Sequence, residues 1–65
     1  MNNRLIEILK NKDVSYAWLG RRLGVGRSSV MRWANGDTTP TKKRYPAIAQ
    51  ALDISEEEVE RIFDR

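Results

Sequence analysis

The sequence predicts an all-α fold, a single domain over residues 1–65 built as a compact bundle of five short helices. Two observations support this prediction: apolar residues recur at helical spacing, and helix-capping residues interrupt that pattern at short intervals. The chain contains no cysteine and no histidine, which excludes disulfides and the usual thiolate and imidazole zinc ligands. A domain of this size must therefore depend on close packing of its helices.

The first two predicted helices have clear boundaries. A stripe of leucines and isoleucines predicts a helix over about residues 3–11. Ser15 is placed to cap a second helix over about residues 16–23, because its hydroxyl can accept a backbone N–H from the first turn. Gly24 ends that helix, since glycine adopts the left-handed backbone conformation without steric cost.

Three more helices follow along the chain. Gly36 closes a helix over about residues 27–34, and a polar loop separates it from a helix over roughly 44–52. The last helix has the clearest start, because Ser55 and Glu58 form the sequence pattern of a capping box. The second and third helices are separated by a glycine-containing turn of about three residues, which is the spacing of a helix-turn-helix.

Charge is unevenly distributed along the chain. The net charge is +3, yet residues 21–44 carry seven basic side chains against the one acid Asp37, whereas residues 53–65 carry six acids against two arginines. The basic middle predicts a face that attracts phosphate, and an unevenly charged solvated surface is the alternative. No apolar run is long enough to span a membrane and no signal-peptide pattern is present, so we expect a soluble cytoplasmic protein.

Residues 15–36 combine apolar positions and glycines in a joint pattern. Gly20 stands at a small-residue position and Gly24 in the turn, and the apolar positions are Leu19, Leu23, Val25, Val30 and Trp33. In this combination the segment resembles the lambda repressor and Cro family of helix-turn-helix domains. Pro40 and the capped last helix extend the resemblance over nearly the whole chain.

The resemblance implies a sequence-specific regulator of transcription that binds double-stranded DNA, a repressor of the Cro/CI type. Its helix over residues 27–34 is expected to read the major groove. A bacterial or phage-encoded protein of the cytoplasm, associated with the nucleoid, is implied as well. A whole Cro-like protein and the N-terminal part of a longer repressor both fit the sequence.

The chain departs from the family pattern at several positions. Tyr16 stands where the family often has a phosphate-contacting glutamine, and Gly26 replaces the serine or threonine that usually caps the third helix. Some members join the first and third helices by an arginine–glutamate pair. Leu9 and Ala34 occupy the matching positions here, so an apolar contact is expected in its place.

Three residues stand where the family places its base-reading side chains: Arg27, Ser28 and Arg32. An arginine binds O6 and N7 of guanine through two hydrogen bonds, so Arg27 and Arg32 are expected to read guanines. Contact with phosphate alone is the alternative for either arginine. Met31 is a fourth candidate, which either packs on a thymine methyl group or is simply exposed.

A second set of polar residues is expected to contact phosphate, which positions the domain without reading sequence. The candidates are Ser15, Tyr16, Asn35, Thr39, Lys42 and Lys43. For the two lysines, a solvated run of charge is the alternative. Trp33 is expected in the core, and Trp18 partly in the core and partly on the surface.

Ile62 and Phe63 either complete the core or form a dimer seam. The family commonly dimerises through its last helix and binds pseudo-palindromic half-sites about one turn of DNA apart, so a homodimer is expected at least on DNA. The alternative function is an antitoxin-like or other protein-interaction module that uses the acidic last helix, with DNA binding secondary. An enzyme is not expected, because no catalytic constellation is evident. No cofactor, metal, membrane contact or small-molecule effector is expected either.

Overall fold

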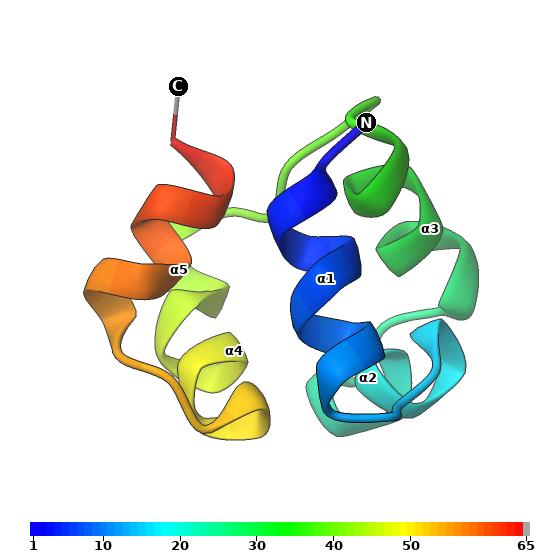
Figure 1. Cartoon of the computed structure of the whole chain (residues 1–65), viewed down its shortest axis with the longest axis horizontal. Helices are drawn as coiled ribbons and strands as arrows, with labels where there is room; N and C mark the ends of the chain where they lie inside the picture. The colour runs from blue at the N-terminus through cyan, green and yellow to red at the C-terminus, as the bar shows by residue number, and fades with distance from the viewer. Residues whose placement is uncertain (65) are drawn as a thin grey trace.

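The computed structural model describes residues 1–64 of the chain, which are mostly α-helical (Figure 1). The elements are α1 (Asn3–Asn11), α2 (Tyr16–Leu23), α3 (Arg27–Asn35), the short 3-10 helix η1 (Lys42–Arg44), α4 (Tyr45–Leu52) and α5 (Glu56–Phe63). No strand occurs among these residues, so the predicted all-α bundle of five short helices is confirmed. Two boundaries differ slightly from the prediction: α3 continues to Asn35, and Arg44 belongs to η1 and not to α4.

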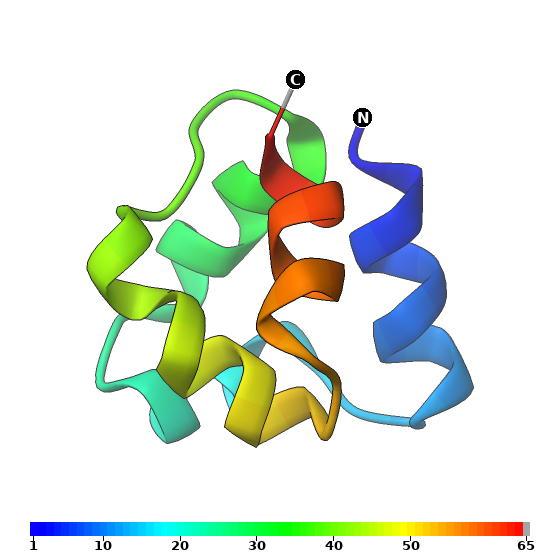
Figure 2. The same ribbon diagram turned by 90° about the vertical axis from the view of Figure 1, so that its left-hand side faces the viewer.

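Helices α2 and α3 pack directly on each other and are braced by the rest of the bundle. Helix α4 packs on both α2 and α5, and α1 packs on α3. In Figure 1, α4 and α5 stand on one side of the bundle, with α1 and α3 on the other. The connection between α3 and η1 arches over one end of the molecule (Figure 2). Each helix of the predicted helix-turn-helix is therefore held by a further helix: α2 by α4, and α3 by α1.

Every α-helix contributes to one apolar core. Its largest fully buried side chains are Leu5, Leu19, Val30, Ile48, Leu52 and Val59. Trp33 is only 5% exposed, as predicted for a core residue. Among the described residues, Met1 is the one large hydrophobic side chain left exposed. Burial of apolar surface, the main favourable term in folding, therefore involves all five α-helices. None of these helices has the length and apolar character needed to cross a membrane.

Ile62 and Phe63 lie in this core. Only 6% and 5% of their surfaces are exposed. The Phe63 ring meets Trp33 edge-on and stacks with Tyr45, and the ring centroids are 6.1 Å apart in both pairs. This separation is within the favourable range for aromatic contacts. Of the two roles predicted for Ile62 and Phe63, completing the core is the one that the structure shows.

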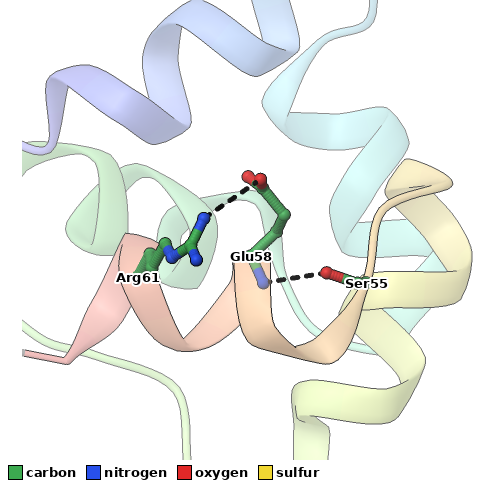
Figure 3. A network of polar contacts seen from close by, with 3 residues as sticks. All are labelled: Ser55, Glu58 and Arg61. Carbon is green, nitrogen blue, oxygen red and sulfur yellow. Dashed lines mark hydrogen bonds and ion pairs between the residues drawn. The ribbon is translucent and has the colours of Figure 1, made fainter.

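Serine hydroxyls cap α2 and α5 as predicted. The Oγ of Ser15 accepts the N–H of Trp18 at 3.0 Å, and the Oγ of Ser55 accepts the N–H of Glu58 at 3.1 Å (Figure 3). The Glu58 carboxylate, however, lies 3.7 Å from the Arg61 guanidinium. Among the described residues the Ser55 backbone N–H does not donate to this carboxylate, so only one half of the predicted capping box is formed.

Left-handed residues follow four of the helices. Gly24 and Gly36, with φ of 72° and 82°, end α2 and α3 as predicted. Asp13 and Asp53, with φ of 56° and 55°, do the same after α1 and α4. The two aspartates were not predicted to do so, because a left-handed conformation is strained for residues with a Cβ atom and the usual sequence signal is glycine.

Candidate nucleic-acid interface

The turn between α2 and α3 is a close contact of backbone on backbone. The Val25 N–H donates to the Gly20 carbonyl at 2.9 Å, and left-handed Gly24 lets the chain reverse after α2. A Cβ atom built on Gly20 would lie 2.8 Å from the Val25 carbonyl oxygen. This contact requires glycine at position 20, because even the single Cβ atom of alanine would have to displace the turn.

Helix α3 is held in place by its apolar face. Its buried residues are Val30, Trp33 and Ala34. The residues predicted to read bases lie outside the core, with Arg27, Ser28 and Arg32 exposed and Met31 half-buried. Within residues 1–64 neither arginine is ion-paired. The structure therefore gathers the four predicted base-reading side chains on one helix and leaves both guanidinium groups open to a ligand.

The start of α1 is fastened to the end of α3. The backbone N–H of Asn2 donates to the Ala34 carbonyl at 2.8 Å. Leu9 and Ala34, which replace the charged pair of the resembled family, are 3% and 0% exposed and belong to the common core. Helix α3 is thus fixed on α1 by apolar packing and one backbone hydrogen bond, in keeping with the predicted loss of the ion pair.

The six predicted phosphate contacts lie at three places around the motif. They are Ser15 and Tyr16 at the start of α2, Asn35 and Thr39 at and after the end of α3, and Lys42 and Lys43 on η1. All are exposed except Tyr16, which is half-buried. Their hydroxyl, amide and ammonium groups are donors suited to phosphate oxygens. The Ser15 oxygen already accepts the helix-capping bond, which leaves its hydroxyl hydrogen free to donate.

Arg44 has a role that sequence reasoning missed, since the sequence groups it with the two exposed lysines before it. Its Nη1 donates to the Leu23 carbonyl oxygen at 3.1 Å, across 21 positions of the chain. The last carbonyls of a helix lack partners within the helix and carry partial negative charge, so an arginine is a favourable donor there. The bond fastens η1, with Lys42 and Lys43, to the end of α2. No local sequence signal marks a contact between such distant positions.

The outer side of α2 is basic and carries a cation–π contact. Arg21 and Arg22 are exposed, and the Arg22 guanidinium carbon lies 5.3 Å from the centre of the Trp18 ring. Such contacts stabilise modestly at exposed sites. Trp18 is half-buried and packs against the core, so its predicted division between core and surface is confirmed.

The acids of the last helix face away from the core. Glu56 and Glu57 are exposed in the first turn of α5, where they complement the positive pole of the helix, and Glu60 is exposed one turn later. Within the described part of the chain, no three His, Cys, Asp or Glu residues are grouped as a metal ion would require. The acids of the first turn thus have a structural explanation in helix electrostatics.

Comparison with protein families supports this assignment of the motif. A family model described as a helix-turn-helix domain matches residues 4–62, from the first turn of α1 almost to the end of α5. No curated protein and no solved structure matches the chain. The family match covers both helices of the motif together with the helices that brace them, in agreement with the resemblance seen in the sequence. The chain belongs to the helix-turn-helix domain family.

Proposed function

We propose that the chain is a sequence-specific, DNA-binding regulator of transcription, a repressor of the Cro/CI type. One observation carries this proposal. Helix α3 buries Val30 and Trp33 on one side and exposes Arg27 and Arg32 outside the core, where neither arginine is ion-paired within residues 1–64. In helix-turn-helix proteins the second helix of the motif enters the major groove, where such guanidinium groups meet base edges.

The base-reading and the phosphate-contacting residues have different roles in binding. Arg27 and Arg32 read guanines through two hydrogen bonds each, a contact worth about 1–3 kcal/mol of discrimination against the wrong base. Ser28 and Met31 complete the base-reading set. The hydroxyls, amide and lysines around α2, α3 and η1 bind phosphate and fix the register of the domain on the duplex.

Two copies bind one operator in this proposal. The apolar side chains Ile62 and Phe63 are used within the chain's own core, and the exposed surface of α5 includes Glu56, Glu57 and Glu60. A symmetric dimer interface formed by this surface would bring the acidic side chains of the two copies together, and their negative charges would repel. We therefore infer that the homodimer forms on DNA, with half-sites about 34–36 Å apart on a pseudo-palindromic operator. An occupied operator that overlaps a promoter blocks polymerase sterically.

The alternative of a protein-interaction module has less support. The centres of protein interfaces are depleted in charged residues and enriched in aromatic ones. The exposed residues of α5 are mainly acidic, and its aromatic Phe63 is buried. Binding to a protein partner through the acidic last helix is therefore the second candidate.

The proposal is tested by selecting bound sites from a random duplex library and measuring affinity at two salt concentrations. An enriched inverted repeat with guanine at fixed positions is expected, together with a steep loss of affinity as salt rises. Weak binding without enrichment of any sequence would refute sequence-specific recognition, and a partner for α5 would then be sought.

A further inference from the structure

A hollow of ≈ 320 Å³ lies between α1 and the starts of α2 and α3. Its apolar lining comes from α1 and from the residue before the α2 cap: Leu9 is buried, and Ile6 and Val14 are half-buried. Ile6 and Val14 pack against the core from the outside and remain partly open to water, whereas Leu9 belongs to the core itself. A ligand with an apolar part gains stabilisation by covering them.

The polar rim of the hollow is positively charged. It is formed by Lys10 at the end of α1, Ser15 and Tyr16 at the start of α2, and Arg27 at the start of α3. Of the described residues that line the hollow, none carries a carboxylate. Two cations and two hydroxyls thus surround an apolar floor, a combination that favours an anion attached to an apolar group.

We infer that this hollow binds one sugar–phosphate unit of the DNA backbone, and that Lys10 is a further phosphate contact. The inference rests on the proposed function, because Ser15, Tyr16 and Arg27 already belong to that site. A deoxyribose offers an apolar face that covers Ile6 and Val14, and its phosphate accepts hydrogen bonds from Lys10, Ser15 and Tyr16. Arg27, which reads a base, adds positive charge at the edge of the hollow. The contact extends the interface from the helix-turn-helix motif to α1.

Lys10 and Lys12 form a matched pair for testing this inference. Both are exposed lysines near the end of α1, and only Lys10 lines the hollow. General attraction between the protein and DNA depends on the two charges nearly equally, since they are two residues apart. Of these two lysines, only Lys10 can contact a phosphate bound in the hollow.

The test compares Lys10→Gln and Lys12→Gln with the unmodified chain on one duplex carrying the selected site. For Lys10→Gln the slope of log affinity against log salt becomes shallower by about 0.9. The ratio of the DNA affinity of the unmodified chain to that of Lys10→Gln therefore falls about 3.5-fold between roughly 50 and 200 mM salt, because the two slopes differ by about 0.9. For Lys12→Gln the slope stays at the unmodified value.

Duplexes with a single neutral methylphosphonate locate the contact. Neutralising one phosphate per half-site weakens binding by the unmodified chain, and it weakens binding by Lys10→Gln and by Tyr16→Phe less, because each variant has already lost one contact to that phosphate. Equal changes for both lysine variants, or no change for Lys10→Gln, would overturn the inference while steep salt dependence of the unmodified chain still supports DNA binding. Absence of salt-dependent binding by the unmodified chain refutes the proposed function and the inference together.

Discussion

The side chain of Asn2 joins the two ends of the domain: its Nδ2 donates to the Ile62 carbonyl at 2.9 Å, across 60 positions of the chain. The same side chain accepts the Leu5 N–H through Oδ1 at 3.1 Å, which caps α1. The Asn2 backbone N–H donates to the Ala34 carbonyl at 2.8 Å. One residue therefore links the start of α1 to the ends of α3 and α5.

Replacing Asn2 with alanine is expected to lower the free energy of unfolding by about 2 kcal/mol. The change removes the cap of α1 and leaves the Ile62 carbonyl without its amide donor, while the backbone bond to Ala34 can remain. Urea denaturation followed by circular dichroism measures the effect. Asn3→Ala is the control, because Asn3 is exposed and its side chain makes no such link among the described residues. Equal stability of the two variants contradicts the assigned role.

Even the smallest larger residue, alanine, is expected to destabilise the fold at position 20. Alanine raises helix propensity by about 1 kcal/mol at an ordinary helix position. At position 20 the added Cβ would lie 2.8 Å from the Val25 carbonyl oxygen, which is backbone and cannot rotate away. Overpacking costs typically about 1–3 kcal/mol, so we expect Gly20→Ala to lower the free energy of unfolding by about 1 kcal/mol. Its affinity for DNA falls as well, because the turn sets the angle of α3.

Gly26→Ser is the matched variant in the same turn. A Cβ on Gly26 has room, since its nearest neighbour is the Ser28 Oγ at 3.7 Å. The serine hydroxyl supplies the side-chain cap that α3 lacks, so a gain of a few tenths of a kcal/mol is expected. Thermal unfolding that shows Gly20→Ala to be as stable as Gly26→Ser would contradict the close contact.

The sequence predicts elements whose signals are local, and misses contacts between distant positions. The serine caps at Ser15 and Ser55 and the glycine ends at Gly24 and Gly36 were predicted correctly, because each depends on a few neighbouring residues. The partner of Arg44 could not be predicted, since charge pattern alone does not separate it from the lysines beside it. The base-reading and phosphate-contacting roles remain predictions of the resemblance, and the structure adds exposure and position to them.

Replacing the aspartates that follow α1 and α4 is expected to raise the free energy of unfolding. Asp53 combines a left-handed backbone, φ 55°, with a negative charge at the negative pole of α4. Asparagine tolerates the same conformation and removes the charge, so Asp53→Asn is expected to raise the free energy of unfolding by about 0.5 kcal/mol. The gain shrinks as salt is added, because the interaction is screened.

Asp13→Asn is expected to behave in the same way after α1. Glu57→Gln provides the opposite case, since Glu57 lies in the first turn of α5 and its charge faces the positive pole. This variant is expected to lose about 0.5 kcal/mol of stability at low salt. Thermal unfolding at low and high salt checks all three variants, and a gain for Glu57→Gln would contradict the electrostatic explanation.

Arg44 and Lys43 are neighbours with different expected effects. Arg44→Gln removes the bond to the Leu23 carbonyl and is expected to lower the free energy of unfolding by about 1 kcal/mol, a value reduced for its partial exposure. Lys43 is exposed, so Lys43→Gln leaves stability unchanged and makes the salt dependence of DNA binding shallower by about 0.9 in slope. Denaturation and salt titration on the same two variants check the distinction. Loss of stability in Lys43→Gln would contradict it.

Arg32 offers the most direct test of base reading. Its guanidinium is exposed on α3 and unpaired within the described residues, so it is open to the edge of a guanine. Arg32→Ala is expected to remove the preference at one position of each half-site, worth about 1–3 kcal/mol, and to leave the other positions selective. Arg22→Ala is the control, because Arg22 lies over Trp18 on α2 and carries the same charge. Affinities for a panel of single-base operator variants measure both. If Arg32→Ala weakens binding uniformly across the panel, as expected for a residue that touches only phosphate, Arg32 is not a base-reading residue.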